Sequence, residues 1–239
     1  MSGQKLYTAL LRKSISLSEG TKHLEFAVEE MNHFPFIAGQ FVSMKAERDG
    51  REITRAYSIV SQPRSDNTFD VCLNRVQFGF FSNYLCDMDH GMRVKFHGPH
   101  GYFVPRNPIR DSVFIGTGTG VAPLRSMLLW LYEDPTRNQG HDFWLVFGTR
   151  YAPELYYHEE FLQMERDHPN FHYIPTLSRE NAGWTGRMGY VQEHVRALAE
   201  GHTDRDAYIC GLKDMVVATR ELLIGLGWDK KSVMFERFD

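Results

Sequence analysis

Over the first hundred residues, apolar and polar side chains alternate in short runs, the pattern of β-strands with one buried face. Turn residues such as Asp49-Gly50 and His90-Gly91 separate these runs. Six short strands at fairly regular spacing predict an antiparallel six-stranded Greek-key β-barrel. One helix, residues 81–88 with Ser82 as its N-cap, interrupts the strands. The expected strands are residues 5–17, 21–30, 39–48, 52–61, 68–76 and 92–99.

After residue 111 the pattern changes, and buried apolar runs alternate with stretches of helical period. This alternation predicts an α/β doubly wound parallel sheet with right-handed crossovers. Pro105 and Pro108 interrupt both patterns, so we expect two domains, residues 1–106 and 107–239. The expected strands are residues 112–118, 142–150, 171–180, 206–212 and 232–238, and the expected helices are 122–134, 153–167, 189–200 and 213–227.

Composition narrows the class of protein. The chain has 239 residues, 42% of them hydrophobic and 24% charged, as in ordinary globular proteins. The sequence contains no run of eighteen apolar residues, so no membrane span is expected. The first residues lack the charged and then apolar pattern of a signal peptide. Three cysteines without ligand spacing predict neither a metal site nor a cysteine-bound cluster, and they fit the cytoplasm.

A glycine run follows the first strand of the second half, in "VFIGTGTGVAPLR". Ligands of doubly wound sheets bind at the carboxyl ends of the strands. Side chains without Cβ atoms let phosphate oxygens approach the backbone N–H groups of such a turn. The run therefore predicts a pyrophosphate site, although a glycine-rich turn without a ligand stays open. Its residues are Gly116, Thr117, Gly118, Thr119, Gly120 and, in the first helical turn, Pro123.

Several motifs occur in order along the chain: "RAYS", "VQFGFFS", "GPHGYF", the glycine run, "FGTR", "CG" and the terminal "FERF". In this order and spacing the chain resembles the ferredoxin–NADP reductase family, in particular its short bacterial members. The resemblance covers nearly the whole sequence. It implies FAD in the barrel, NADP(H) on the α/β domain, and hydride transfer between two rings that meet face to face.

The resemblance also assigns roles in flavin binding. It implies that Arg55 pairs with flavin phosphate, that Tyr57 stacks on the ring, and that Ser58 places its hydroxyl near the hydride-accepting nitrogen. Gly79 and Ser82 would hold the pyrophosphate at a helix N-terminus, and Phe238 would stack on the flavin. For Leu73, Asn74 and Val76, which lie where the family's next strand contacts the flavin, simple core or surface packing explains the residues equally well. The expected FAD-binding residues are Arg55, Ala56, Tyr57, Ser58, Leu73, Asn74, Val76, Gly79, Phe80, Phe81, Ser82 and Phe238.

On the nucleotide side, Cys210 and Gly211 match the motif beside the nicotinamide, and Glu236 matches a carboxylate near the flavin. The expected catalytic residues are thus Ser58, Cys210 and Glu236. Arginines at three motifs resemble those that hold a 2′-phosphate, which favours NADPH over NADH. Arg125 is expected to be a surface residue. The NADP-binding residues further include Thr149, Arg150, Ser178, Arg179 and Arg187.

The expected partner is a separate ferredoxin or flavodoxin, with no nucleic acid and no membrane, and the protein is expected to be a monomer. Residues 1–110 carry a charge of +3 and residues 111–239 a charge of −6, so an acidic carrier would meet the first half. The arginines expected to attract it are Arg48, Arg51, Arg64 and Arg106. Alternatives are a free-flavin or quinone reductase, an oxygenase reductase component, a regulatory subunit, or a binding protein without flavin.

Overall fold

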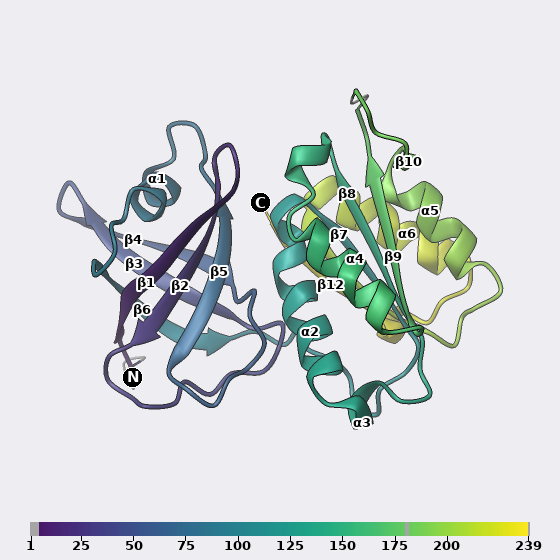
Figure 1. Ribbon diagram of the computed structural model, residues 1–239, viewed down its shortest axis with the longest axis horizontal. Coiled ribbons are helices and arrows are strands. Elements are labelled where there is room, and N and C mark those ends of the chain that lie inside the picture. The colour runs from purple at the N-terminus through teal and green to yellow at the C-terminus, as the bar shows by residue number, and fades with distance from the viewer. Residues whose placement is uncertain (1–4, 180–181, 239) are drawn as a thin grey trace. The chain divides into compact units, whose positions relative to one another are not determined.

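The computed structural model describes residues 5–179 and 182–238 (Figure 1). The chain divides into two compact units, each with its own core. The barrel unit comprises Met1–Val104 together with Arg125–Trp130, and the sheet unit comprises Pro105–Leu124 and Leu131–Asp239.

The barrel unit is built on a six-stranded antiparallel sheet, which confirms the fold class expected for the first half. Neighbouring strands run in the order β4-β3-β6-β1-β2-β5. Beyond the end of β4, Ile59 pairs with Val71 of β5 and closes the sheet on itself. The strands are β1 (Tyr7–Ser18), β2 (Thr21–Val28), β3 (Phe41–Arg48), β4 (Arg51–Ser58), β5 (Thr68–Asn74) and β6 (Arg93–His100).

Aromatic side chains fill the interior of the barrel. The ring of Phe69 lies 5.2 Å from the rings of both Phe34 and Phe96, and 5.7 Å from that of Phe26. All four side chains are buried. Burial of each such side chain contributes about 2–3 kcal/mol, so this cluster is a main source of the unit's stability.

One helix, α1 (Phe80–Cys86), follows β5 and packs on the core through Phe81 and Leu85. It begins earlier than expected, with Gly79 as its N-cap, so the prediction of Ser82 as the cap is wrong. The Ser82 hydroxyl oxygen instead accepts a hydrogen bond from the Val76 N–H at 3.0 Å. The hydroxyl therefore serves the turn before the helix and not the helix end.

The sheet unit has a parallel six-stranded sheet, as expected, in the order β10-β9-β8-β7-β11-β12. The chain runs outward from β7 to β10 and returns to β11, so the order reverses between β7 and β11. Such a switch point is where ligands of doubly wound folds bind. The strands are β7 (Ser112–Thr117), β8 (Phe143–Thr149), β9 (Phe171–Leu177), β10 (Arg187–Met188), β11 (Asp206–Leu212) and β12 (Val233–Phe238).

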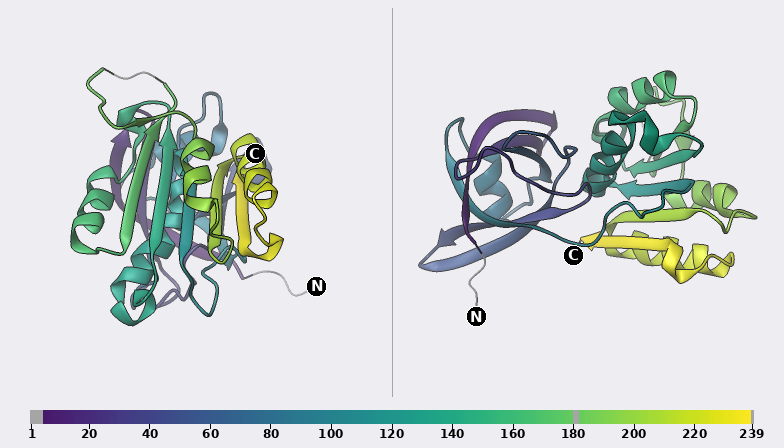
Figure 2. Two further views of the ribbon diagram at one scale, coloured as in Figure 1. Left: turned by 90° about the vertical axis from the view of Figure 1, so that its right-hand side faces the viewer. Right: turned by 90° about the horizontal axis from the view of Figure 1, so that it is seen from below.

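Helices cover both faces of this sheet. Figures 1 and 2 show α4 on one face and α5 and α6 on the other. Buried apolar residues of α5 and α6, among them Val195 and Val216, form one cluster with Val113, Ile115 and Ile209 of the sheet. The helices are α2 (Val121–Glu133), α3 (Pro135–Asn138), α4 (His158–Asp167), α5 (Val191–Ala199) and α6 (Lys213–Gly225), with 3-10 turns η1 (Gly118–Gly120), η2 (Ala152–Glu154) and η3 (Lys230–Ser232).

Two stretches differ from the expected elements. Helix α4 was expected from residue 153, but η2 and a left-handed Tyr157 (φ 62°) precede it and delay its start to His158. The two-residue strand β10 was not expected, because so short a strand leaves no alternation to recognise. Glu180, the expected end of the third parallel strand, lies outside the described residues.

A search of the described helices for a long, apolar segment that could cross a lipid bilayer finds none.

Candidate active site

Strand β4 carries the "RAYS" motif, whose residues differ in their exposure to solvent. Arg55 is exposed, and its guanidinium donates to the Thr54 carbonyl oxygen at 2.8 Å. Within the described parts of the chain, no carboxylate forms an ion pair with it, so its charge is open to an anionic ligand. Ala56 is exposed, whereas Ser58 is buried at the end of the strand.

Tyr57 is half-buried, and its ring centroid lies 6.0 Å from that of Phe81 in α1. Burial, with a smaller contribution from Cys86, raises the pKa of Tyr57 well above its ordinary value. The phenol is therefore neutral at physiological pH. A neutral ring held by the core on one side suits stacking against a flat heterocycle on the other.

The turn between β5 and α1, residues 76–79, is fixed by side chains of the helix. Asn83 donates to the carbonyl oxygens of Val76 and Gly79, and Ser82 accepts from the Val76 N–H. A Cβ on Gly79 would lie 2.9 Å from the Val76 Cβ, which explains the glycine. Phe78 is left 92% exposed in a left-handed conformation with φ of 61°. No sequence signal marked Phe78, because Phe disfavours this conformation.

Leu73 and Asn74 of β5, and Val76 just after the strand, were expected to bind the flavin and lie in three different settings. Leu73 is buried in the barrel core. The amide oxygen of Asn74 accepts a hydrogen bond from the Thr21 hydroxyl at 2.7 Å. Val76 is 58% exposed beside the turn. The side chains of Leu73 and Asn74 thus make contacts within the barrel. Phe80 stacks on Tyr84, with ring centroids 6.1 Å apart.

The three glycines of the run, the first of which lies in β7, are required for two different reasons. A Cβ on Gly116 would meet Leu124 at 2.9 Å, and a Cβ on Gly120 would overlap the Cys210 carbonyl oxygen. Both glycines therefore permit close packing within the sheet unit. Gly118 has a φ of 55° and open space around it. Of the three glycines, only Gly118 leaves open space in which a ligand could approach the backbone. Phosphate binding alone therefore does not explain why all three positions are glycine.

Thr117 makes this turn suited to a polar ligand. Its hydroxyl oxygen is buried and lacks a hydrogen-bond partner among the described residues. A Cβ on Gly211 would overlap that hydroxyl, so β11 approaches the turn closely. A buried hydroxyl without a partner is costly, and a bound hydrogen-bonding group removes the cost. The turn thus fits a dinucleotide at the switch point. Thr119 lies in η1, and Pro123 is buried in the first turn of α2.

Strand register brings Cys210 next to two other candidates. It pairs with Gly116 of β7 on one side and with Glu236 of β12 on the other. Cys210 is fully buried, and this burial, with the charge of Glu236, raises the pKa of its thiol well above the usual value. The thiol is therefore protonated at neutral pH. Phe238, half-buried, pairs with Leu212 two positions farther along.

Three exposed arginines lie near the carboxyl ends of β8 and β9: Arg150 and Arg179 follow these strands, and Arg187 begins β10 opposite Thr176 of β9. The Arg179 N–H donates to the Arg150 carbonyl oxygen at 3.2 Å, which brings the chain after β9 beside the chain after β8. Arg187 pairs with Thr176 in the next strand, and the Trp184 indole N–H donates to its carbonyl oxygen at 2.9 Å. Among the described residues, no carboxylate forms an ion pair with any of the three guanidinium groups, although the Arg150 backbone N–H donates to the Glu154 carboxylate at 3.2 Å.

Two hydroxyl residues complete this edge. The Thr149 hydroxyl donates to the Tyr151 carbonyl oxygen at 3.0 Å, and the Ser178 hydroxyl donates to the Thr149 carbonyl oxygen at 3.3 Å. Both hydroxyl groups therefore shape the strand ends. The ends of β8 and β9 gather three permanent positive charges, and paired guanidinium groups are the usual means of binding a phosphate.

Comparison with known proteins identifies both halves. The sequence profile of the oxidoreductase FAD-binding domain matches residues 8–104, and that of the oxidoreductase NAD-binding domain matches residues 114–221. The chain is 38% identical over 232 residues to ferredoxin–NADP reductase B of Sorangium cellulosum, with 93% of each chain covered. The chain belongs to the ferredoxin–NADP reductase family.

Family membership makes the protein a flavoprotein oxidoreductase with one domain for FAD and one for a nicotinamide dinucleotide. Relatives also include the glycine betaine monooxygenase reductase subunit of Pseudomonas aeruginosa, 30% identical, which covers 89% of this chain and 59% of the relative. A crystal structure of the Neisseria gonorrhoeae ferredoxin NADP+ reductase with FAD and NADP has a TM-score of 0.84 at 22% identity, covering 98% of both chains, and shows the shared fold.

The structure corrects the expected basic surface of this family member. Arg64 pairs with the buried Asp70 through two hydrogen bonds of 2.9 and 2.7 Å. The Arg106 guanidinium lies 2.9 Å from the Asp206 carboxylate. Both arginines are therefore neutralised internally. Arg48 and Arg51, at the exposed turn between β3 and β4, are the two expected docking arginines that remain at the surface.

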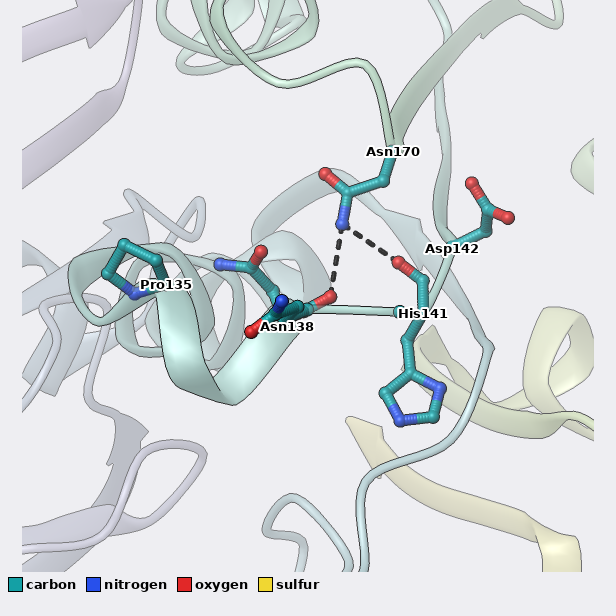
Figure 3. Close-up of a pocket in the computed structure, with 7 residues that line it drawn as sticks. Pro135, Asn138, His141, Asp142 and Asn170 are labelled. Carbon is teal, nitrogen blue, oxygen red and sulfur yellow. Dashed lines mark hydrogen bonds between the residues drawn. The ribbon is translucent and has the colours of Figure 1, made fainter.

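One polar hollow lies away from the ligand-binding edge. It is formed by the segments that precede β8 and β9, at the amino ends of those strands (Figure 3). The Asn170 side chain spans it and donates to the carbonyl oxygens of Asn138 and His141, at 3.2 and 2.8 Å. These hydrogen bonds hold the two loops that line the hollow together.

Across the described chain, no group of three metal-ligating side chains converges.

Proposed function

We propose that the protein is an NADPH-dependent reductase that exchanges electrons with a separate ferredoxin or flavodoxin. The observation that carries this proposal is the turn of residues 116–120. There the buried Thr117 hydroxyl, which has no hydrogen-bond partner among the described residues, and the open, left-handed Gly118 lie at the switch point of the sheet, beside Cys210. Bound FAD supplies the chemistry, because a flavin takes a hydride from NADPH and passes electrons on singly.

The barrel residues would bind and orient the flavin. Arg55 would pair with its phosphate through an exposed guanidinium. Tyr57 would support one face of the ring, and Ser58 would place its hydroxyl at the edge of the ring. The backbone of the fixed turn at residues 76–79 would contact the pyrophosphate, because Asn83 and Ser82 already hold its shape. These roles need no movement of the turn before binding.

The sheet unit would select the phosphorylated nucleotide. Arg150, Arg179 and Arg187 would surround the 2′-phosphate of NADPH, which a bare ribose lacks. Their support is that each guanidinium is exposed and has no carboxylate partner within the described chain. Cys210, protonated and buried, would pack against the nicotinamide and exclude water. Glu236 would supply a proton beside it.

The acceptor would be a small acidic carrier that meets the exposed Arg48 and Arg51 of the barrel unit. The three cysteines are free and buried, which supports work in the reducing cytoplasm. We further infer that the protein acts as a monomer. The matching reductase subunits of oxygenases favour a second candidate, in which the acceptor is an oxygenase component.

The decisive experiment begins with the purified protein, from which the chromophore is released and identified by mass. The holoprotein is then titrated with NADPH and NADH, and cytochrome c reduction is measured with and without added ferredoxin or flavodoxin. The proposal expects FAD, stronger binding of NADPH, and stimulation by a carrier. A colourless protein that ignores both nucleotides would refute it. Reduction of free flavin or quinone without any carrier effect would support the reductase alternatives.

A further inference from the structure

The side chains of Arg125 and Ser126 in α2 form hydrogen bonds with the chain segment that directly follows the "RAYS" motif. The Arg125 guanidinium donates to the Val60 carbonyl oxygen at 2.9 Å, and the Ser126 hydroxyl donates to the Ser61 carbonyl oxygen at 2.6 Å. Ser126 is fully buried and Arg125 is half-buried, so the expectation that Arg125 is a surface residue is wrong. All these residues belong to the barrel unit.

The strand exit, defined as residues 59–61, is held by backbone bonds on its other sides. The Ile59 N–H donates to the Gln40 carbonyl oxygen and the Val60 N–H to that of Asp70, both at 2.9 Å. The Asp70 N–H donates to the Ser61 hydroxyl at 3.1 Å. The side chains of Arg125 and Ser126 therefore complete the hydrogen bonding of the strand exit, and buried carbonyl groups left unpaired are costly.

The strand exit follows Ser58 directly, and Ser58 belongs to the motif proposed to contact the flavin. At its other end, α2 begins at Val121, immediately after the glycine turn proposed to take the dinucleotide. Gly120 and Arg125 are five residues apart, about 7.5 Å along a helix axis. A helix over this distance is stiff, so a change at its first turn reaches Arg125 with little loss.

Resting on the proposed function, we propose that Arg125 and Ser126 are positioning residues that couple the two binding sites. By binding the carbonyl groups of Val60 and Ser61 they fix the strand exit, and with it the backbone of Ser58. Binding of the dinucleotide at the glycine turn steadies the first turn of α2. The strand exit, already bonded to Arg125 and Ser126, is then held more firmly, and with it the flavin-binding strand.

Hydrogen exchange of the holoprotein with and without NADP+ tests this coupling. In the wild-type chain, NADP+ is expected to slow exchange in peptides that contain residues 116–125 and also in those that contain residues 58–61. The second effect should be about fivefold, the lower end of ordinary coupling between two sites. Protection of residues 116–125 without any change at 58–61 would overturn the proposal. Absence of protection at both would instead refute the proposed nucleotide site.

Three variants separate positioning from a merely structural role. Arg125→Met keeps the length of the side chain but removes the donor, so NADP+ should no longer slow exchange at residues 58–61. In this variant NADP+ should still slow exchange at residues 116–120. Arg125→Lys restores a donor and should restore the response. Arg166→Met, at an exposed arginine of α4 that bonds Gln163, is the control and should behave as wild type.

A kinetic measurement gives an independent readout. The rate at which NADPH reduces the flavin should fall about tenfold in Arg125→Met, while the KM for NADPH should change less than about twofold, as for a lost positioning contact. The absorbance change of the flavin on NADP+ binding should shrink in parallel and recover in Arg125→Lys. If Arg125→Met lowers only the melting temperature and leaves rate and spectrum unchanged, Arg125 is structural and the proposal is wrong.

Discussion

Cys210 and Glu236 occupy paired positions on β11 and β12, so a thiol and a carboxylate lie side by side at the carboxyl ends of these strands. Burial is the larger cause of the raised pKa of Cys210, and the charge of Glu236 adds to it. The Cys210 thiol is therefore protonated at neutral pH and does not act as a nucleophile. This assignment separates the protein from thiolate enzymes, in which positive neighbours lower the pKa of the cysteine.

The first prediction concerns thiol reactivity. In the native protein at neutral pH, Cys210 should react with Ellman's reagent at least roughly tenfold more slowly than free cysteine. All three cysteines should react after denaturation, because they are free and buried. Glu236→Gln removes only the smaller cause, so Cys210 should stay slow in this variant. Fast labelling of Cys210 in the native wild-type chain would contradict the neutral assignment.

The second prediction compares two glycines of one turn. Gly118→Ala should cost only about 1–2 kcal/mol of stability, because the site is open and the strain lies in the left-handed backbone. Gly120→Ala should cost more, about 3 kcal/mol, because its Cβ would overlap the backbone of Cys210. Urea unfolding measures both. Equal losses in the two variants would show that the glycines are needed for the same reason.

The third prediction concerns the buried Asp70. Burial would raise its pKa, but hydrogen bonds from His23 and Arg64 and their charges outweigh burial and leave it lowered. The carboxylate thus stabilises the fold above its unfolded pKa, near 4, and this contribution is lost as the pH falls through the lowered native pKa. Asp70→Asn should destabilise the protein by about 3 kcal/mol at neutral pH and flatten the acid side of its stability profile.

The control for Asp70 is Asp89→Asn, at an exposed carboxylate on the same unit. It should change the free energy of unfolding by less than about 0.5 kcal/mol at any pH. Urea unfolding between pH 3 and pH 7, as approximate limits set by the carboxyl pKa, measures both variants. If the stability of Asp70→Asn varied with pH in parallel with that of the wild type, the claim that the charged Asp70 carboxylate stabilises the fold would be wrong.

The fourth prediction tests nucleotide selection. Arg179→Gln should raise the KM for NADPH about tenfold or more, the value of one charge-assisted hydrogen bond. Its kcat/KM with NADH should change less than about twofold, since a bare ribose offers no 2′-phosphate to bind. Arg166→Gln on α4 is the matched control. Equal losses with both nucleotides would assign Arg179 to general binding.

Sequence pattern predicted most of the fold, for a physical reason. Alternation of apolar and polar residues reveals strands such as β6, which begins with exposed and buried residues in turn, and a largely apolar run reveals β11, which is buried along six of its seven residues. Short and strained segments leave no such pattern, so β10, the delayed start of α4 and the left-handed Phe78 escaped prediction. Each depends on tertiary contacts, as the bonds from Asn83 to the turn before α1 illustrate.

The sites followed the same rule. Motif residues on strand ends could be located from the sequence, because strand ends gather at one edge of a parallel sheet. Charge alone could not show which arginines are free. Arg64, Arg106 and Arg125 look like surface residues in the sequence, yet the chain supplies an internal partner to each. The partners of Arg106 and Arg125 lie 100 and 65 residues away, beyond the reach of any local pattern, whereas that of Arg64 lies 6 residues away.

The most direct test of the account is anaerobic rapid mixing of the purified holoprotein with NADPH while the flavin absorbance is followed. We expect the flavin band to bleach in a single turnover, more slowly when the transferred hydrogen of NADPH is deuterium. NADH should need a much higher concentration for the same rate. A flavin band that NADPH leaves unchanged, or a protein that carries no flavin, would contradict the account.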